Sequence, residues 1–414
     1  MSIRNIIMSA AGADQEQYWY STMNTSGVYF PAIAITNDNN LVLGGSYLSL
    51  YVIGKNTGTQ ISASYGSIAG SKMWSGIAVD ASGNIYAAGT TLATTNKLLI
   101  NKYTPTLGLT AQYILTTATD LLGARLAFNG TDVIIAATYV NATYAYEGYC
   151  HLNSSFTHIR TPVLYETGLS TFCNNVAVQS SIFTAGRQNG NAFINSRLAA
   201  DGTIAFKSKL SIAEPVSGLA VYGVATVKVD AGITGVYLVS VATSTGAITQ
   251  QKRLYDGTTI FDKETTSPSI MYKKSTICGN PASYNSYSVA SGGGALYLIK
   301  ANILLDIAWQ RKIVFTGKNL VAYSIVMSSD EKFVYITGVN TTDDDIFNIK
   351  MPCDGSLIGT FGSIVISAST LTVEASSLTV SAAGTAMTIT PTVATNTDTY
   401  SNSSIWTVTP TNLN

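Results

Sequence analysis

The chain has 414 residues, of which 23 are basic and 23 acidic, so its formal net charge is zero. Charged residues make up 11% of the sequence, against about 25% in an ordinary globular domain. A chain without a net positive field is poorly suited to bind nucleic acid or an anionic membrane surface, and we expect neither as a partner.

The first segment, residues 1–13, reads MSIRNIIMSAAGA. Its apolar core at residues 6–8 is shorter than the 7 to 15 residues that a signal peptide needs, so we do not expect it to direct export. No stretch approaches the roughly 18 apolar residues of a membrane span. We interpret residues 1–14 as an N-terminal docking arm that folds on contact with a neighbouring protein.

A repeated unit organises most of the chain, and it is clearest at residues 75–102. There an apolar strand at 77–79 is followed by the turn Asp80-Ala81-Ser82-Gly83-Asn84, a second strand closing at Gly89 and a third strand ending at Lys102. The first strands of the seven units are predicted at 33–36, 77–79, 125–128, 176–178, 218–221, 270–273 and 323–327. Units five and six are the least regular, with second strands predicted at 225–229 and 276–279 and third strands at 236–241 and 296–300.

A basic residue ends the third strand in six units, namely Lys55, Lys102, His151, Arg197, Lys300 and Lys350, with Ser240 in the fifth. We expect these basic residues to have a structural role, in which each pairs with a carboxylate or carbonyl of a neighbouring unit or solvates the end of its strand. The first four are separated by 47, 49 and 46 residues, the period of a four-stranded propeller blade. Fourth strands are predicted at 110–116, 205–211, 249–255 and 307–314. The sequence therefore predicts an all-β fold, a seven-bladed β-propeller of four-stranded blades over residues 15–366.

A strand at residues 17–24, which contains Tyr18, Trp19 and Tyr20, has no partner before it in the sequence. Because an open ring of sheets leaves unpaired edges, we predict that this strand closes the ring as the outer strand of the seventh blade. The competing interpretation gives that place to residues 360–367.

The last segment, residues 367–414, is rich in Ser, Thr, Ala and Val. Apolar residues alternate with polar ones at 371–373, 378–380, 387–389 and 405–408, which indicates strands. We predict a small C-terminal β-module, ordered against a neighbouring subunit, and disorder is the alternative.

The sequence gives little support for a catalytic site or a metal-binding site. The four cysteines form no CxxC pair and we expect them to be free and mostly buried, while the two histidines are too few for a His-based triad or zinc site. Asp343, Asp344 and Asp345 could hold a hard cation, but their spacing is not that of an EF-hand, and a solvated acidic loop is the favoured interpretation. The carboxylates Glu147, Asp201, Glu214, Asp256 and Asp262 share no repeated motif and are interpreted as surface charge. We therefore predict no enzyme activity, no cofactor and no metal.

Tyrosines in segments that resemble loops are the candidate recognition residues. They are Tyr139, Tyr144, Tyr146 and Tyr149 in the third unit, and Tyr284 and Tyr287 in the sixth. Aromatic rings of this kind stack on sugars or on protein partners. The alternative is that they are ordinary strand residues.

Two resemblances follow from these motifs. The pattern G-N-x-Y-x-x-G-x-T at residues 83–91, with Lys102 after it, resembles a β-propeller repeat of bacterial secreted and surface proteins. Residues 1–13 and the Ser/Thr-rich tail resemble structural proteins of tailed bacteriophages. The second resemblance implies a virion component of the tail, nozzle, baseplate or fibre, in a homo- or hetero-oligomeric assembly. Its partners would be other tail proteins and a glycan or protein of the host surface.

Two other hypotheses remain open from the sequence. One is a secreted, extracellular carbohydrate-binding propeller of bacteria, similar to an adhesin or lectin. The other is a propeller hydrolase, which would need a pair of carboxylates about 5 to 9.5 Å apart.

Overall fold

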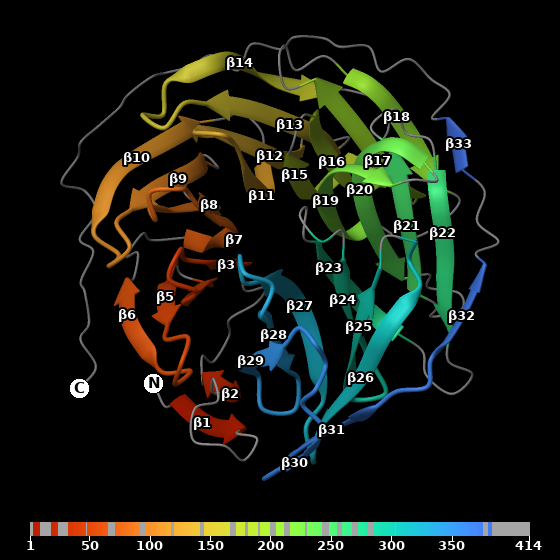
Figure 1. Ribbon diagram of the computed structural model, residues 1–414. Helices are drawn as coiled ribbons and strands as arrows, with labels where there is room; N and C mark the ends of the chain where they lie inside the picture. Colours follow the sequence, from red (N-terminus) through yellow and green to blue (C-terminus); the bar gives the residue numbers. More distant parts are fainter. Residues whose placement is uncertain are drawn as a thin grey trace.

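The computed structural model arranges antiparallel sheets around a central axis (Figure 1). The residues that the structure describes are 3–8, 18–23, 32–46, 48–64, 71–91, 97–116, 120–140, 145–165, 171–178, 181–188, 191–198, 204–210, 216–227, 230–241, 248–254, 259–266, 272–279, 283, 285–302, 304–375 and 380–382. None of these residues forms a helix that is long and apolar enough to cross a membrane.

Within that part of the chain there are seven sheets, which we call blades one to seven in chain order. Blade one contains β3 (Ala32–Ile35), β4 (Leu41–Gly44), β5 (Leu50–Ile53) and β6 (Gln60–Ser64). Blade two contains β7 (Ser71–Val79), β8 (Ile85–Thr91), β9 (Lys97–Tyr103) and β10 (Leu109–Thr116). Blade three contains β11 (Asp120–Asn129), β12 (Asp132–Val140), β13 (Ala145–Leu152) and β14 (His158–Tyr165). Blade four contains β15 (Thr171–Val178), β16 (Ser181–Gln188), β17 (Asn191–Leu198) and β18 (Ile204–Leu210).

The remaining blades repeat the plan, with the first strand nearest the axis (Figure 1). Blade five contains β19 (Val216–Val227), β20 (Asp230–Val241), β21 (Ile248–Leu254) and β22 (Thr259–Thr266). Blade six contains β23 (Tyr272–Gly279), β24 (Ser286–Gly292), β25 (Ala295–Ala301) and β26 (Ile307–Phe315). Blade seven contains β27 (Leu320–Met327), β28 (Phe333–Asn340) and β29 (Asp345–Pro352). The prediction of an all-β propeller is confirmed.

The ring is closed by the front of the chain. Strand β2 (Tyr18–Met23) pairs antiparallel with β29, and Trp19 and Tyr20 lie opposite Lys350 and Ile349. Of the three residues expected to close the ring, Trp19 and Tyr20 pair with β29, while Tyr18 pairs with Met8. Residues 3–8 of the expected docking arm form β1 (Ile3–Met8), which pairs with β2 and adds a fifth strand to blade seven.

The described part of the tail does not form a sheet of its own. Strand β31 (Ile364–Ala368) pairs with β26, with β30 (Gly359–Phe361) on its outer side, so residues 360–367 do not close blade seven. Strands β32 (Thr372–Ala375) and β33 (Val380–Ala382) pair with β22 and β18. The tail thus adds strands to blades six, five and four in turn, and we call β31, β32 and β33 the belt (Figure 1). Residues 383–414 of the predicted C-terminal module lie outside the described residues.

Two units were assigned in the wrong register from sequence. The residues predicted as first and second strands of unit six lie together around the single strand β23, and the true second strand is β24, which contains Tyr287. In unit five, Ser240 belongs to the second strand, β20, and residues 249–255 fall on the third strand, β21. The reason is strand length: β19 and β20 run for 12 residues each, so their apolar residues resemble three short strands.

Turn chemistry explains why the hairpins form where they do. Between β7 and β8, the Asp80 carboxylate accepts hydrogen bonds from the main-chain N–H groups of Ser82 and Asn84, and Gly83 takes a φ of 84°. Between β24 and β25, Gly293 and Gly294 both have positive φ, as a two-residue hairpin turn requires. Gly293 and Gly294 therefore form a tight turn.

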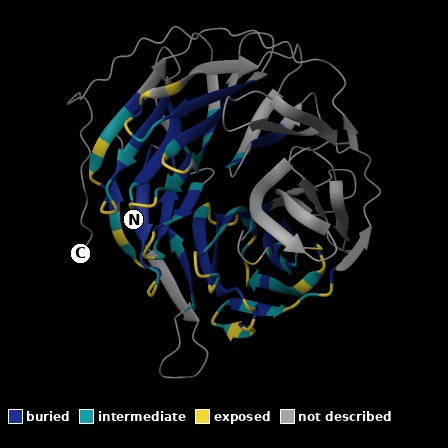
Figure 2. Cartoon of the chain, turned by 45° about the horizontal axis from the view of Figure 1, so that its top comes forward, coloured by how far each residue is buried: buried dark blue, intermediate teal, exposed yellow. Residues whose placement is uncertain are grey.

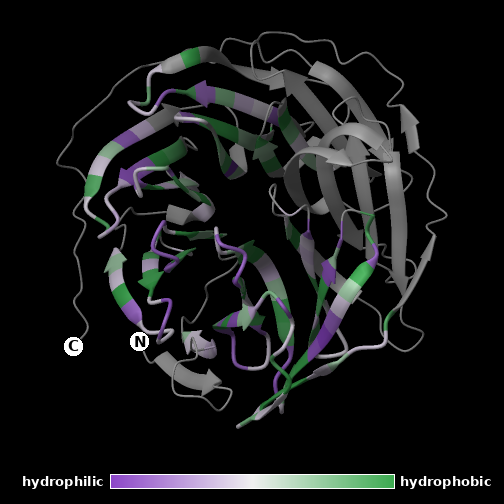
Figure 3. Cartoon of the chain, in the orientation of Figure 1, coloured by the Kyte–Doolittle hydropathy of each residue, from purple (hydrophilic) through white to green (hydrophobic). Residues whose placement is uncertain are grey.

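The core lies between neighbouring blades, where the faces of consecutive sheets pack together. One cluster joins apolar residues of blades six and seven with Ile364 and Ile366 of β31, and another joins Trp19 of blade seven to blade one. Buried residues follow the strands and exposed ones gather at turns and on outer strands (Figure 2), and the strands are the more apolar parts (Figure 3). Contacts between blades therefore hold the ring together.

Candidate functional site: polar clasps between blades

A lysine of the third strand reaches from one blade to the next at three junctions. Lys102, Lys300 and Lys350 lie opposite Tyr86, Tyr287 and Tyr335 of the second strand. Their Nζ atoms donate to main-chain carbonyls in the next blade, at Ser154 (3.4 Å), Cys353 (3.5 Å) and Lys55 (3.0 Å) respectively. We call this arrangement a clasp. The predicted structural role of the repeated basic residue is confirmed at these junctions.

The alignment of blade one needs a correction. A β-bulge follows Lys102 and Lys300 in the pairing of third and fourth strands, and in blade one it follows Val52. Lys55 is therefore not the repeated strand residue, because it lies in the turn after β5. Lys55 instead contributes its main-chain carbonyl, which accepts the hydrogen bond from Lys350 Nζ.

Two tryptophans reinforce the clasps. The indole Nε1–H of Trp19 donates to the carbonyl of Lys55 (2.9 Å), and that of Trp309 donates to the carbonyl of Cys353 (3.1 Å). The rings lie over Gly58 and Gly355, where a Cβ atom would stand 2.7 Å and 2.6 Å from the indole. A side chain at either glycine would displace the tryptophan, so the turn and the ring depend on each other.

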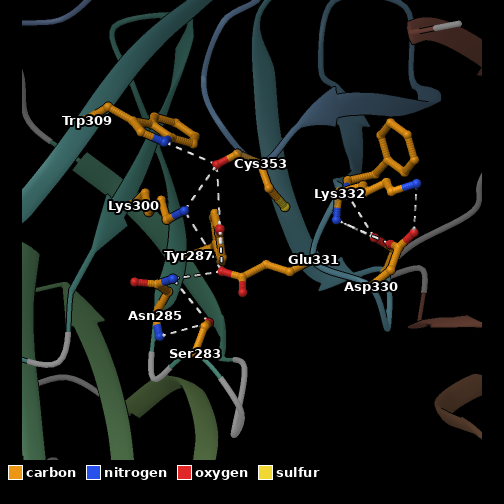
Figure 4. Close-up of polar contacts among 11 residues, drawn as sticks. Ser283, Asn285, Tyr287, Lys300, Trp309, Asp330, Glu331, Lys332 and Cys353 are labelled. Atoms are coloured by element: carbon orange, nitrogen blue, oxygen red, sulfur yellow. Dashed lines mark hydrogen bonds and ion pairs between the residues drawn. The ribbon is translucent and has the colours of Figure 1, made fainter. Parts of the chain in front are cut away.

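Figure 4 shows the polar contacts at the junction between blades six and seven. The Glu331 carboxylate, from the turn between β27 and β28, accepts hydrogen bonds from Asn285 Nδ2 (2.8 Å) and the Tyr287 hydroxyl (2.8 Å). Lys300 Nζ stands 3.8 Å from the same oxygen, and Ser283 accepts from Asn285. Both lysine and carboxylate are mostly shielded from solvent.

The surroundings of Glu331 favour its ionised, carboxylate form. Burial raises the pKa of Glu331, but hydrogen bonds from Ser283, Asn285 and Tyr287 and the charge of Lys300 outweigh it and hold the pKa below its ordinary value. Burial raises the pKa of Tyr287 and, in the same way, raises that of the Cys353 thiol to about 12. Near neutral pH the site therefore contains a carboxylate, an ammonium group, a phenol and a protonated thiol.

The protonation states and hydrogen bonds of these side chains suit a structural contact between blades better than catalysis. A thiolate is the nucleophilic form of cysteine, and the Cys353 thiol is held in its protonated form. The oxygen of Glu331 that faces blade six already has two donors and an ammonium group beside it. The arrangement fastens blade six to blade seven.

Glu331 was not singled out from the sequence. Its φ is 54°, and its N–H donates to the carbonyl three residues earlier, as the N–H of Gly83 does in blade two and that of Asn39 in blade one. The sequence does contain one sign of the site, a glutamate at the turn position where other units have Gly or Asn. A left-handed backbone conformation is uncommon for glutamate and often marks a functional or structural role.

Four of the six tyrosine candidates lie among the described residues, and all four belong to strands. Tyr149 lies in β13 and Tyr287 in β24, and both are buried, so the prediction that they lie on loops is wrong. Tyr139 and Tyr146 fall within β12 and β13, opposite each other in the register. Tyr144 and Tyr284 lie outside the described residues, and their recognition role stays a prediction.

The acidic residues considered from sequence have different surroundings in the structure. Asp343 pairs with Lys318 and accepts a hydrogen bond from Asn340, while Asp344 is exposed. Glu147 is fully buried in β13, so its assignment as a surface charge is wrong. Among the described residues, no group of three His, Cys, Asp or Glu side chains is placed to hold a metal ion.

The fold and these junctions define a β-propeller scaffold whose blades are joined by side-chain clasps. No protein-family model matches the sequence, and no curated protein matches it either. Three solved propellers are similar in structure. The Pan2 WD40 domain of Neurospora crassa has a TM-score of 0.52 at 9% identity, covering 78% of this chain and 88% of that one. BBS1N, solved in complex with ARL6DN, has a TM-score of 0.50 at 12% identity, and the match covers 78% of this chain and 92% of that one. The Dos1 propeller has a TM-score of 0.50 at 10% identity, and the match covers 81% of each chain. Such low identities establish the fold alone.

Proposed function

We propose that this protein is a non-enzymatic structural component of a tailed-phage virion, in the tail, nozzle, baseplate or fibre. The observation that carries the proposal is the resemblance of residues 1–13 to the start of phage structural proteins, together with the Ser/Thr-rich tail. A propeller scaffold with few charged residues suits a role in assembly through protein contacts. Its partners are other tail proteins, and its loops are available to a glycan or protein of the host surface.

The clasp at Glu331 supports the non-enzymatic part of the proposal. Its hydrogen bonds run between two blades of the same chain and restrain their relative position. A virion part that must keep its shape under mechanical load benefits from such junctions. The location that follows is the virion tail.

The direct test is to purify particles from a culture that produces the protein, and to detect the chain by mass spectrometry and immunogold electron microscopy. We expect labelling at the tail, at a constant ratio to the major tail proteins. Recovery of the chain only from the culture medium, free of particles, would refute the proposal and favour the secreted carbohydrate-binding alternative. In that case a glycan array should give a signal that is lost in Tyr144→Ala or Tyr284→Ala.

A second experiment concerns the arm. Residues 3–8 form an edge strand, whereas ring closure depends on β2, so a chain lacking residues 1–13 should still fold. We expect the shortened protein to be soluble and absent from particles. Particles that incorporate it at the normal ratio would show that the arm does not dock.

A further inference from the structure

The belt has a seven-residue repeat that matches the succession of blades. Its three copies are Ile-Val-Ile-Ser-Ala-Ser-Thr (364–370), Leu-Thr-Val-Glu-Ala-Ser-Ser (371–377) and Leu-Thr-Val-Ser-Ala-Ala-Gly (378–384). The fifth position is Ala368, Ala375 or Ala382, and each of these alanines is the last residue of its belt strand. One copy of the repeat therefore supplies one strand to one blade.

The belt meets blades six, five and four at the same place in each. Ala368, Ala375 and Ala382 lie opposite Arg311, Lys263 and Ser208 of the fourth strands. Each of those residues pairs in turn with the third-strand residue two positions before the β-bulge, namely Leu298, Gln250 and Ile194. A shared register in three blades shows that the repeat and the blade edge are matched.

The connections between belt strands are short and nearly equal in length. Three residues (369–371) separate β31 from β32, and four residues (376–379) separate β32 from β33. Gln310 of blade six holds the first connection, because its side-chain amide accepts from the N–H of Leu371 (3.1 Å) and donates to its carbonyl (3.2 Å). A connection of only three or four residues gives each strand the adjacent blade of its own chain as the nearest edge.

The next blade edge in this direction belongs to β14 of blade three. Among the described residues β14 pairs with β13 alone, and an unpaired sheet edge can accept an added strand. Pro162 lacks a main-chain N–H, so residues 163–165 are the part of this edge that has the full set of backbone groups. Val163 pairs with Tyr149, two positions before His151, and the register of blade three shifts both between Tyr149 and His151 and after His151. Counted by its third-strand partner, Val163 is the counterpart of Arg311, Lys263 and Ser208.

The next seven residues, Thr-Ala-Met-Thr-Ile-Thr-Pro at 385–391, keep an apolar residue at the third position, although Thr385 replaces the aliphatic first residue and Ile389 the fifth-position alanine. Residues 387–389 stand seven positions after β33, and their alternation independently predicts a strand. The connection from β33 would again be four residues, 383–386. Pro391 follows two residues later, and proline does not continue a ladder in both directions.

We propose that the outer edge of β14 is a docking site for residues 387–389 of the same chain. The strand is antiparallel, and Met387, Thr388 and Ile389 lie opposite Tyr165, Leu164 and Val163. Main-chain hydrogen bonds supply the binding, so alanine in the fifth position can be replaced by isoleucine without loss of the ladder. The added strand covers an edge that would otherwise be open to pairing with another protein. This proposal is independent of the phage role.

The test is a pair of double-cysteine variants under mild glutathione oxidation, with the disulfides mapped by mass spectrometry. Directly opposite residues have Cβ atoms about 4.5–5.5 Å apart, so Thr388→Cys with Leu164→Cys should cross-link within one molecule. The control, Thr388→Cys with Val163→Cys, shifts the pair by one residue and places the thiols on opposite faces. We expect at least tenfold more intramolecular disulfide in the first variant. Equal yields, no disulfide, or disulfides only between two molecules would each overturn the proposal.

Hydrogen exchange of the full-length chain gives a test without cysteines. Thr388→Pro removes a main-chain donor from the proposed strand, and Thr411→Pro is the control outside it. We expect amide exchange at residues 163–165 to accelerate at least tenfold in the first variant and to stay unchanged in the second. Unchanged exchange in Thr388→Pro would contradict docking on β14.

Discussion

The indole of Trp19 donates a hydrogen bond to the carbonyl of Lys55, 36 residues later and in the neighbouring blade. The same carbonyl accepts a second hydrogen bond from Lys350 Nζ, almost at the other end of the propeller. One acceptor therefore joins the closing strand, the last blade and the first blade.

Removal of both donors should cost more than the two single changes combined. Trp19→Phe keeps an aromatic ring but loses the N–H, and Lys350→Met loses the ammonium group, so each single variant leaves one donor on the Lys55 carbonyl. We expect each hydrogen-bond loss to cost about 1 kcal/mol, whereas the double variant leaves a partly buried carbonyl without either donor, at an extra cost of about 1 kcal/mol. Urea unfolding of the four proteins measures the coupling. Strictly additive changes would contradict the shared-acceptor description.

Gly355→Ala should destabilise the protein more than Gly317→Ala does. Both glycines have positive φ, 70° and 76°, so each substitution carries a backbone cost of about 1 kcal/mol. Only at Gly355 would the new Cβ meet a neighbour, the Trp309 ring at 2.6 Å, because nothing lies within 4 Å at Gly317. We expect an additional loss of about 1–3 kcal/mol in the first variant. Thermal unfolding with tryptophan fluorescence checks this, and equal losses would show that the indole moves freely.

Glu331→Gln should remove a pH-dependent part of the stability. The pKa of Glu331 is lower in the folded state than in the unfolded chain, so its contribution is present above the unfolded pKa and is lost as the pH falls through the folded pKa. We expect wild type to exceed the variant by about 1–2 kcal/mol near neutrality, with the difference shrinking once the pH falls below about 4.3.

The matched control for that experiment is Asp38→Asn, because Asp38 is exposed in the corresponding turn region of blade one. Its stability should differ from wild type by less than about 0.5 kcal/mol at all pH values. A Glu331→Gln curve parallel to wild type from pH 7 to pH 3 would show that the carboxylate does not stabilise the junction.

The thiols of Cys150 and Cys353 should be inert in the folded protein. Burial raises the pKa of each to about 12, and both side chains are shielded from solvent. We expect labelling of these two residues by iodoacetamide at pH 8 to be at least 100-fold slower in buffer than in 6 M guanidinium chloride. Peptide mapping by mass spectrometry reads out each site. Rapid native labelling of Cys353 would indicate that the junction of blades six and seven opens.

Local patterns were sufficient to predict the repeat. The alternation of apolar residues, the Asp80 to Asn84 turn and the spacing of basic residues all act over a few residues, so the strands of blades one, two, three, four and seven could be placed from sequence. The partner of residues 17–24 was also predictable, because a ring of sheets requires one more strand for closure.

The tertiary structure decided what sequence patterns leave open. Glu331 meets Tyr287 across 44 residues, and no local rule connects a turn in one blade to a strand in the previous one. Tyr149 and Tyr287 resemble loop residues until the pairing of their strands buries them. The alternation at 371–373 correctly indicated the strand β32, and the strand predicted at 378–380 overlaps β33 at Val380. An alternating strand pairs equally well in its own sheet or on another edge. Which edge it takes depends on the blades that the rest of the chain has already built.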